Sequence, residues 1–466
     1  MSTTSKAQKV LVIGLDCADP VLMFEKFYDR LPNIKALTQQ GLFGPMQSCM
    51  PPITVPAWSC MASSKDPGQL GVYGFRNRAD WSYNRLSFAT SLEIKEPRIW
   101  NILSQIGKKS FVLGVPGTYP PSAINGWMVG CFLSPSIESN YTYPVGLKNE
   151  IAEVFGEYMI DVKGYRTEEK KWLLDEIYKM SSQRFAMARH FMKKCDWDLF
   201  WMVDMGVDRI HHGFWQFMDP THHRYVKGGP WENAIFDLYK FIDDQIGELL
   251  KLVDLDKTAV WIVSDHGAKC MTGGVCFNDW LIRQGYLTLT TTPNKTTKFS
   301  DVTIDWSKTK AWGEGGYYGR CFFNVQGREQ NGQIPQKDYE KFAQKLSDEL
   351  TGMVDHEGKP MGTKVYRPSQ LYKTVKGTPP DLIVLFGNLN WRSVGTVGNP
   401  SVYTFENDTG PDDANHNTHG IFITAGAGLS GQTGRREITI YDFAPTVMSQ
   451  MNLPLPKDMI GKNIIA

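Results

Sequence analysis

Acidic and imidazole side chains stand at the ends of several apolar segments of this 466-residue chain. Carboxylate and imidazole groups together are the ligands that Zn²⁺ and similar first-row ions prefer. The chain has only nine histidines, so their concentration at segment ends indicates a metal site. The candidate residues are, in chain order, Asp16, Asp204, Asp208, His211, His212, Asp265, His266 and His419.

The spacing of these residues limits how they can meet. Asp208 and His212 are four residues apart, so they share one face if that turn is helical. Asp265 and His266 are adjacent, so both can reach one point only from irregular backbone. Each residue alone has another interpretation, because an aspartate at a strand end often caps a helix and a single buried histidine is often structural.

A hydroxyl group that could act as a nucleophile lies in the segment Pro51-Pro-Ile-Thr-Val-Pro-Ala-Trp58. A hydroxyl beside a divalent cation loses its proton more readily than in water. Thr54 precedes an expected helix over 57–63, whose positive end would face an anion. The alternative is that Thr54 merely caps this helix, with Pro56 in its first turn.

Short apolar runs that resemble buried parallel strands must position these side chains. Helical periodicity lies between them, at 23–31, 34–40, 173–194, 230–253 and 441–451. Alternating strands and helices predict a three-layer α/β/α fold with a mostly parallel central sheet, and ligands bind beyond the carboxyl ends of such strands. The expected strands are Val10–Leu15, Ser110–Val115, Leu199–Val203, Ala259–Ser264, Asp381–Phe386 and Gly420–Ala425.

Two irregular stretches interrupt this pattern, at about 131–170 and 270–320. The first is rich in Gly, Pro, Ser and Tyr, and the second in Thr, Gly and Lys. Both lie between expected core strands, so we expect cap or loop insertions over a site. The whole chain, 1–466, is therefore expected to be a single catalytic domain.

The motifs together resemble a known family. Gly14-Leu-Asp16, Thr54-Val-Pro56, Asp208-x-x-x-His212, Ser264-Asp-His-Gly267 and Thr418-His-Gly420 occur in the order found in the type I phosphodiesterase/nucleotide pyrophosphatase branch of the alkaline phosphatase superfamily. The chain most resembles the microbial group called predicted phosphohydrolase or phosphomutase. The motifs extend over nearly the whole sequence, so the resemblance covers the whole expected domain.

The resemblance implies two divalent metal ions, with Zn²⁺ expected first and Mn²⁺ or Fe as alternatives. It implies that Asp208, His212 and His419 hold one ion, and that Asp16, Asp265, His266 and the Thr54 oxygen hold the other. It also implies that Thr54 attacks phosphorus and forms a phospho-threonine, which water then hydrolyses. Two ions roughly 4 Å apart are suited to such an in-line displacement.

Two departures from related families are informative. Sulfatases need Cys or Ser followed by x-Pro-x-Arg, and Cys60-Met-Ala-Ser lacks both later residues. Diesterase relatives place an Asn after a His-Gly-Ile element, where this chain has Val72-Tyr-Gly-Phe-Arg-Asn77. Asn77 is therefore the candidate donor to a phosphate oxygen, whereas Arg76 or Arg78 could bind a more highly charged monoester.

We expect a phosphodiesterase or nucleotide pyrophosphatase acting on a small-molecule phosphate ester. A phosphomonoesterase, a phosphonate hydrolase, a phosphomutase or a non-catalytic binding protein of this fold are the alternatives. Lys plus Arg is 50 and Asp plus Glu is 49, so no nucleic-acid partner is expected. No segment has the roughly 20 apolar residues that span a bilayer, and no signal peptide is evident, so we expect a cytoplasmic protein. A homo-oligomer is kept as an alternative to a single chain.

Overall fold

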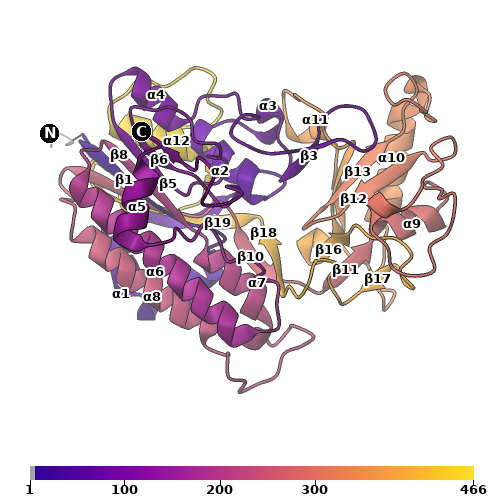
Figure 1. Cartoon of the computed structure of the whole chain (residues 1–466), viewed down its shortest axis with the longest axis horizontal. Helices are drawn as coiled ribbons and strands as arrows, with labels where there is room; N and C mark the ends of the chain where they lie inside the picture. The colour runs from indigo at the N-terminus through magenta and orange to yellow at the C-terminus, as the bar shows by residue number, and fades with distance from the viewer. Residues whose placement is uncertain (1–5, 466) are drawn as a thin grey trace.

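The computed structural model describes residues 6–465 and contains a large and a small lobe. The large lobe, at the left of Figure 1, has a central sheet covered by helices on both faces. Most of its buried apolar side chains form one continuous core around that sheet. The three-layer α/β/α fold expected from the sequence is therefore present.

The central sheet is mostly parallel. β1 pairs in parallel with both β8 and β9, and β5 pairs in parallel with β8 and β6. Six consecutive residues of β8 and six of β9 are fully buried, as expected for strands covered on both faces. In spatial order the strands are β20 (Gly434–Arg435), β2 (Leu42–Gln47), β19 (His419–Gly426), β9 (Thr258–Val263), β1 (Lys9–Leu15), β8 (Leu199–Asp204), β5 (Ser110–Leu113), β6 (Gly126–Val129) and β7 (Thr142–Tyr143), with β21 (Ile438–Thr439) beside β2.

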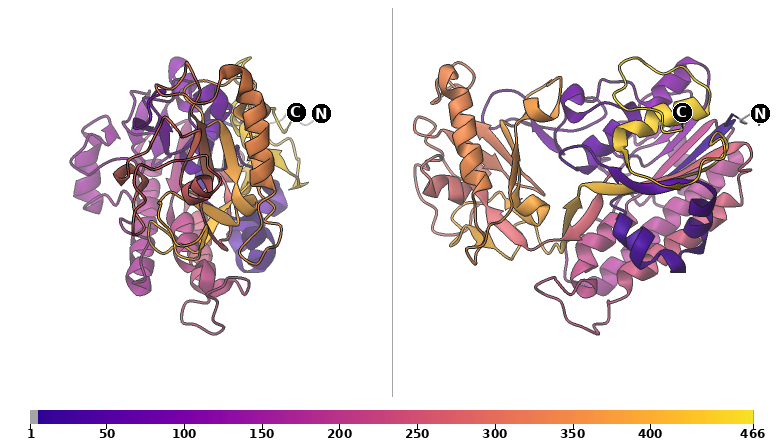
Figure 2. Two further views of the ribbon diagram at one scale, coloured as in Figure 1. Left: turned by 90° about the vertical axis from the view of Figure 1, so that its right-hand side faces the viewer. Right: turned by 180° about the vertical axis from the view of Figure 1, so that it is seen from behind.

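Helices cover both faces of this sheet. One layer contains α1 (Pro32–Gln40), α6 (Lys170–Lys194), α7 (Gly206–Met218) and α8 (Ala234–Leu250), which pack side by side. The other contains α2 (Thr54–Ser63) against α12 (Phe443–Gln450), with α4 (Ile99–Gln105) nearby; Figure 2 shows the two layers on opposite sides of the sheet. The remaining helices of this lobe are α3 (Pro67–Leu70) and α5 (Leu147–Phe155). The expected helix over 23–31 is instead a π-helical turn at Leu22–Lys26 followed by a 3-10 turn at Tyr28–Arg30.

Two of the expected parallel strands run differently. The segment Gly420–Ala425 lies in β19, which is antiparallel to both β2 and β9. The segment Asp381–Phe386 contains β15 (Leu382–Leu385), which lies outside the central sheet and pairs antiparallel with its neighbours. A short apolar run is compatible with either direction, because strand direction is set by the connections and not by the side chains.

The small lobe has its own apolar core. The lobe extends from β11 to β17, so it is longer than the stretch at 270–320 that the composition indicates. A four-stranded antiparallel sheet and a three-stranded sheet form it, at the right of Figure 1. Its elements are β11 (Gly273–Cys276), α9 (Phe277–Arg283), β12 (Ala311–Glu314), β13 (Gly319–Phe323), α10 (Tyr339–Thr351), β14 (Lys364–Tyr366), α11 (Pro368–Leu371), β15, β16 (Trp391–Val394) and β17 (Tyr403–Thr404).

Three features lie at the junction of the lobes. An antiparallel pair, β10 (Gly267–Cys270) with β18 (Ala414–Asn417), leaves the central sheet and leads into the small lobe and back. A third apolar cluster packs Ile53 and Tyr73 of the large lobe against Tyr318 and Tyr372 of the small lobe. A two-stranded pair, β3 (Arg76–Arg78) with β4 (Leu86–Phe88), lies at the same junction. Among residues 6–465, no helix is long and apolar enough to cross a bilayer.

Candidate metal centre and active site

Thr54 is the first residue of α2, and its hydroxyl does not cap the helix. The residue before it, Ile53, occupies the capping position without a side-chain hydrogen bond. The Thr54 hydroxyl instead lies 3.3 Å from Nε2 of His266, in a buried position. The capping interpretation of Thr54 therefore does not hold, and the hydroxyl is available for chemistry.

Asp16, Asp265 and His266 converge beside this hydroxyl. Asp16 follows β1 and the other two follow β9, which is the neighbouring strand. Nε2 of His266 lies 3.3 Å from Oδ2 of Asp265 and 3.8 Å from Oδ1 of Asp16. All three side chains are fully buried. The carboxyl ends of adjacent parallel strands thus bring the three groups to one point, as the topology requires.

The outer atoms of this first cluster are fixed by hydrogen bonds, whereas the two inner carboxylate oxygens are not. Trp58 of α2 donates to Oδ2 of Asp16 at 2.7 Å, and the backbone N–H of Cys17 donates to Oδ1 of Asp265 at 3.2 Å. Nδ1 of His266 faces the carbonyl of Gly267 at 3.1 Å, which leaves Nε2 as the inward atom. Oδ1 of Asp16 and Oδ2 of Asp265 are buried without any hydrogen-bond partner in the described part of the chain. Buried unpartnered carboxylate oxygens are costly, so their convergence fits a divalent cation.

A second cluster consists of Asp208, His212 and His416. Asp208 and His212 lie on one face of α7, with Oδ1 of the first 3.2 Å from Nε2 of the second. His416 comes from β18, and its ring stacks on that of His266 with centroids 3.7 Å apart. Nδ1 of His416 bonds the Pro52 carbonyl at 2.8 Å, so its Nε2 is available as a ligand. The ligand atoms in each cluster lie within 4.8 Å of one another.

Asp412 orients His212. Its Oδ1 lies 2.7 Å from Nδ1 of His212, so Nε2 of that ring faces Asp208. A carboxylate behind a ligating imidazole fixes the tautomer and strengthens the ligand. Tyr317 of the small lobe stacks on His212 at 5.0 Å and places its hydroxyl 3.2 Å from Nε2.

The two carboxyl groups of the first cluster are crowded and buried, and this raises the pKa of both. Burial, reinforced by Asp208, raises the pKa of Asp16 well above its ordinary value, and burial together with Asp16 does the same to the pKa of Asp265. Burial lowers the pKa of His266 to about 4, so that ring is neutral and able to ligate. A bound cation would relieve the repulsion between the carboxylates.

His212 behaves differently from His266. Burial alone would lower its pKa, but Asp412 and then Asp208 outweigh burial and raise the pKa well above the ordinary value. At Asp208, burial alone would raise the pKa. The charges of His212 and Arg209 outweigh burial and hold this pKa well below its usual range. Asp208 is therefore an anion near neutral pH, as a ligand to a divalent ion must be.

His419 does not join the second cluster, contrary to the expectation from the sequence. It begins β19, pairs with Gln47 of β2, and its Nε2 lies 3.3 Å from Glu437, on a half-buried face. His416, three residues earlier, takes the position next to Asp208 and His212. The physical reason is that β18 pairs with β10 directly beyond Asp265 and His266, so only its residues reach the centre.

Asn77 also lies away from the centre. Its Oδ1 accepts from the Tyr73 backbone at 2.8 Å and its amide donates to the Gly74 carbonyl at 3.0 Å. The side chain thus closes a turn, and the neighbouring Arg76 lines the pocket instead. Arg78 is buried against Glu329 at 3.1 Å and has a structural role.

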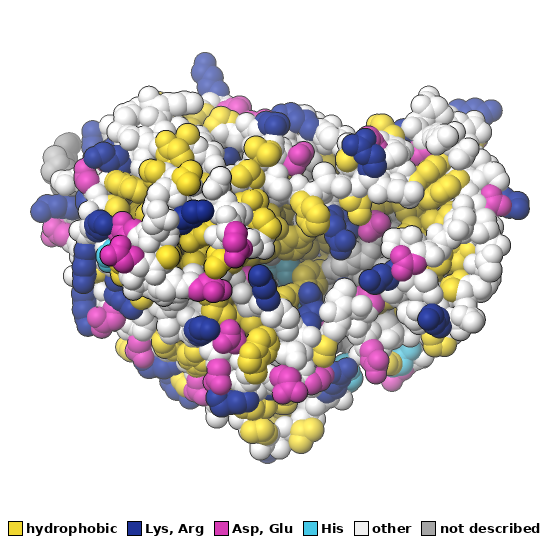
Figure 3. All heavy atoms as spheres, in the orientation of Figure 1, with side chains coloured by type: hydrophobic (Ala, Val, Ile, Leu, Met, Phe, Trp, Pro, Cys, Tyr) yellow, Lys and Arg dark blue, Asp and Glu magenta, His cyan; other side chains and the backbone are white. Residues whose placement is uncertain are grey.

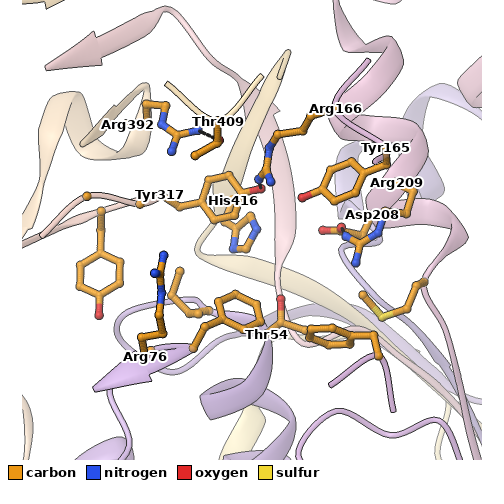
Figure 4. A pocket seen from close by; sticks show the side chains of 18 of the residues that line it. Thr54, Arg76, Tyr165, Arg166, Asp208, Arg209, Tyr317, Arg392, Thr409 and His416 are labelled. Atoms are coloured by element: carbon orange, nitrogen blue, oxygen red, sulfur yellow. Dashed lines mark hydrogen bonds and ion pairs between the residues drawn. The ribbon is translucent and has the colours of Figure 1, made fainter. Parts of the chain in front are cut away.

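A cavity of about 380 Å³ opens above Thr54, between the lobes. Figure 3 shows this hollow near the middle of the molecule, with a histidine side chain on its floor and basic side chains around it. Five of its lining residues are arginines and two are aspartates. Figure 4 shows Thr54 and Arg76 pointing up into it, Arg166 and Arg392 pointing down from the opposite side, and Asp208 with Arg209 at one end.

Two other candidates from the sequence have structural roles. Asp204 accepts from Ser181 at 2.9 Å and from the Gly206 backbone at 3.0 Å, so it holds the start of α7. His211 packs against Tyr239, whose hydroxyl lies 3.2 Å from its Nε2. Neither side chain belongs to the two clusters.

Several functional residues carry no recognisable sequence signal. Asp412 lies just before β18, Tyr317 lies in the small lobe far along the chain from the candidate ligands, and Arg166 lies in the irregular stretch before α6. Arg209 directly follows Asp208 in the sequence. It contacts Asp208 and makes a 2.7 Å ion pair with Asp161. Its position next to a candidate metal-ligating aspartate is the sequence signal that indicates a role for Arg209.

Comparison with known proteins agrees with this geometry. The family model described as type I phosphodiesterase/nucleotide pyrophosphatase matches residues 10–420. No curated protein sequence matches the chain significantly. The solved structure of human ectonucleotide pyrophosphatase/phosphodiesterase 5 aligns with a TM-score of 0.57 at 14% identity, over 98% of both chains. The murine protein aligns with a TM-score of 0.57 at 13% identity, over 96% of both chains, and so does its inactive threonine-to-alanine variant in complex with AMP.

Proposed function

Because the chain belongs to the type I phosphodiesterase/nucleotide pyrophosphatase family of the alkaline phosphatase superfamily, we propose that it hydrolyses phosphodiester or pyrophosphate bonds through a phospho-threonine on Thr54. One observation carries the proposal. The Thr54 hydroxyl is free of helix capping and lies 3.3 Å from Nε2 of His266, beside two buried carboxylate oxygens that have no hydrogen-bond partner within residues 6–465. A hydroxyl in such a place is suited to nucleophilic attack.

The reaction proceeds in two displacements at phosphorus. In the first, a bond forms between the Thr54 oxygen and phosphorus, the ester P–O bond breaks, and the departing oxygen takes up a proton. In the second, water attacks phosphorus and the bond to Thr54 breaks, which restores the hydroxyl. The position of Thr54 at the N-terminus of α2 adds backbone N–H groups that favour the charged phosphoryl oxygens.

The two clusters supply the ligands for two divalent cations. Asp208, His212 and His416 would hold one, and Asp16, Asp265, His266 and the Thr54 oxygen the other. Bound ions of this kind lower the pKa of a hydroxyl and neutralise charge that develops on phosphate oxygens. The mixed carboxylate and imidazole ligands favour Zn²⁺, and Mn²⁺ and Fe accept the same set.

The test compares two chromogenic substrates. Wild-type protein with added Zn²⁺ or Mn²⁺ is assayed with bis-p-nitrophenyl phosphate, a diester, and with p-nitrophenyl phosphate, a monoester. A diesterase turns over the first with the larger kcat/KM. Thr54→Ala removes the nucleophile and is expected to lower kcat by at least about a thousandfold.

A matched control comes from the same helix. Ser63 also lies in α2, and its hydroxyl only donates to the Ser59 carbonyl at 2.7 Å, so Ser63→Ala is expected to keep the activity. Full activity in Thr54→Ala would refute the nucleophile. A larger kcat/KM for the monoester would assign the enzyme to the phosphomonoesterases, and turnover of neither ester would favour a binding protein.

The location and partners form part of the same proposal. All eight cysteines are free thiols, and six of them are buried. Thiols persist in reducing compartments, which is consistent with a cytoplasmic enzyme. A small-molecule phosphate ester is the partner that a cavity of about 380 Å³ accommodates.

A further inference from the structure

We propose that the substrate carries a second anionic group, a carboxylate or a further phosphoryl group, which Arg76, Arg166 and Arg392 bind across the cleft between the lobes. The inference rests on the proposed function, since it extends the same cavity from the reacting phosphorus to the far wall. It names a substrate class, namely esters with two separated oxyanions.

The three arginines come from three different parts of the fold. Arg76 lies in β3, beside the turn that Asn77 closes, and its exposed side chain has no ion pair or hydrogen bond within residues 6–465. Arg166 precedes α6, and Arg392 lies in β16 of the small lobe. All three line the cavity that contains Thr54. An unpaired guanidinium facing a cavity is a ready partner for an oxyanion.

Arg166 and Arg392 are held from behind by carboxylates: Asp412 lies behind both, and Oδ1 of Asp408 lies 3.4 Å from a terminal nitrogen of Arg392. Oδ2 of Asp412 lies 2.9 Å from Nε of Arg166 and 3.8 Å from a terminal nitrogen of Arg392. Asp412 is fully buried and does not line the cavity, so it fixes the two cations without covering their cavity side. Nε of Arg392 is buried and has no hydrogen-bond partner among the described residues. Guanidinium groups fixed in this way bind an anion with little loss of side-chain entropy.

The other two arginines of the cavity are paired with carboxylates that lie at or beside the cavity. Arg209 is neutralised by Asp161, at 2.7 Å, and by Asp208. Arg320 approaches Glu314 at 3.7 Å. The two clusters beside Thr54 already provide for the reacting phosphate. Figure 4 shows Arg166 and Arg392 on the opposite side of the cavity from Thr54, with Tyr317 next to them, so they are placed for a group distant from the reacting phosphorus.

The experiment uses chromogenic diesters that differ only in one distal group. Each is a p-nitrophenyl phosphate esterified to a chain of two or four methylene groups that ends in a carboxylate, a phosphonate or a neutral carboxamide. Charge-assisted hydrogen bonds are roughly twice as strong as neutral ones, so kcat/KM is expected to be about tenfold or more higher for the anionic members. Comparison of the carboxylate and phosphonate members identifies which oxyanion is preferred.

The variants locate the effect. Arg76→Met is expected to reduce the ratio of kcat/KM between anionic and carboxamide esters to near one, through KM. Arg85→Met is the matched control, because Arg85 follows β3 closely, pairs with Asp80 at 2.6 Å and does not line the cavity, and it is expected to keep the ratio. Arg166→Lys keeps a positive charge beside Asp412 but loses the planar guanidinium. It is expected to give an intermediate ratio of kcat/KM between anionic and carboxamide esters.

A binding measurement separates this inference from the proposed function. Calorimetric Kd values of the metal-supplemented protein are compared for unreactive alkylphosphonates that end in a carboxylate or in a carboxamide. Tighter binding of the carboxylate, lost in Arg76→Met, supports the second site whether or not any diester is turned over. Equal Kd values, or equal kcat/KM for all esters while bis-p-nitrophenyl phosphate is hydrolysed, would overturn the second site and leave the proposed function standing.

Discussion

At the scale of single residues, the centre depends on which atom of each histidine faces inward. Nδ1 of His266 faces the Gly267 carbonyl, and Nδ1 of His416 faces the Pro52 carbonyl. Nδ1 of His212 faces the carboxylate of Asp412. Nε2 of each ring is thereby directed to the centre. Backbone partners of this kind fix ring orientation before any ligand arrives.

The choice between His416 and His419 can be tested directly. His416→Ala is expected to lose about one metal ion per chain and to lower diester hydrolysis at least about a hundredfold, because one ligand of the second cluster is removed. His419→Ala is the matched control and is expected to keep both metal content and rate, since His419 faces Glu437. Metal content by mass spectrometry and the rate with bis-p-nitrophenyl phosphate measure the two effects. The opposite pattern would restore the assignment made from sequence spacing.

A pH effect on stability is expected from Asp413. Burial raises its pKa to about 7, against an ordinary value near 4, and Asp412 adds to the rise. Between pH 5 and 8 the folded carboxyl releases a proton that the unfolded chain has already lost. The folded state therefore binds more protons in this window, and the free energy of unfolding decreases as pH rises through about 7.

Asp413→Asn removes that dependence. Between pH 5 and pH 8, the free energy of unfolding of the wild type is expected to fall by about 2 to 3 kcal/mol more than that of the variant. Urea denaturation at the two pH values gives the difference. The exposed Asp348→Asn serves as control and is expected to show a much smaller change. A variant that follows the wild-type pH profile would show that Asp413 ionises normally.

At the scale of elements, α2 and β1 are fitted to each other around Asp16. A Cβ at Gly14 would lie 2.6 Å from the ring of Trp58 and 2.7 Å from Val203. The absence of a side chain at Gly14 therefore allows Trp58 to approach the strand and to donate to Asp16 at 2.7 Å. The packing of one helix on one strand thus fixes a carboxylate of the centre.

Gly14→Ala is expected to push Trp58 away from Asp16. Overpacking of this kind costs about 1 to 3 kcal/mol of stability, and the displaced carboxylate should weaken metal binding. Urea denaturation and chelator competition measure the two effects. Gly146→Ala, where a Cβ meets nothing within 4 Å, is the control. Unchanged stability and metal affinity in Gly14→Ala would show that the contact is not restrictive.

The elements also show what sequence reasoning can reach. The strands that end shortly before Asp16 and before Asp265 and His266, and the strand that precedes the helix of Asp208, are predicted from the sequence, because buried parallel strands have a distinctive apolar pattern. The direction of β19 and the sheet that contains β15 are not, because both depend on long-range pairing. The sequence favours His419 over His416, for which a structural role is at least as compatible with the Asn-rich segment as a ligand role; only the pairing of β18 with β10 decides between the two histidines.

At the scale of the whole molecule, the cavity belongs to both lobes. The large lobe supplies Thr54 and the two clusters, and the small lobe supplies Tyr317 and Arg392. Asp412, in the connection between the lobes, bonds His212 and Arg166 and approaches Arg392. The extent of the small lobe was underestimated from composition, because its later strands have an ordinary apolar pattern that does not reveal which sheet they join.

Removal of metal is expected to destabilise the whole protein. Ions that bind only the folded state stabilise it by about 4 kcal/mol when their concentration is a thousandfold above Kd. Treatment with a chelator should therefore lower the unfolding temperature, and Zn²⁺ should restore it. Asp265→Asn, which removes a ligand of the first cluster, is expected to show a smaller chelator effect than wild type. Identical unfolding temperatures with and without chelator would contradict the metal sites.

The central claim is that two ions lie beside Thr54. Anomalous diffraction from Zn²⁺-soaked crystals, recorded on both sides of the zinc absorption edge, measures it directly. The account predicts two peaks roughly 4 Å apart, one among Asp208, His212 and His416 and one among Asp16, Asp265 and His266 within reach of the Thr54 oxygen. No peak at these residues, or a single peak at His419, would contradict it.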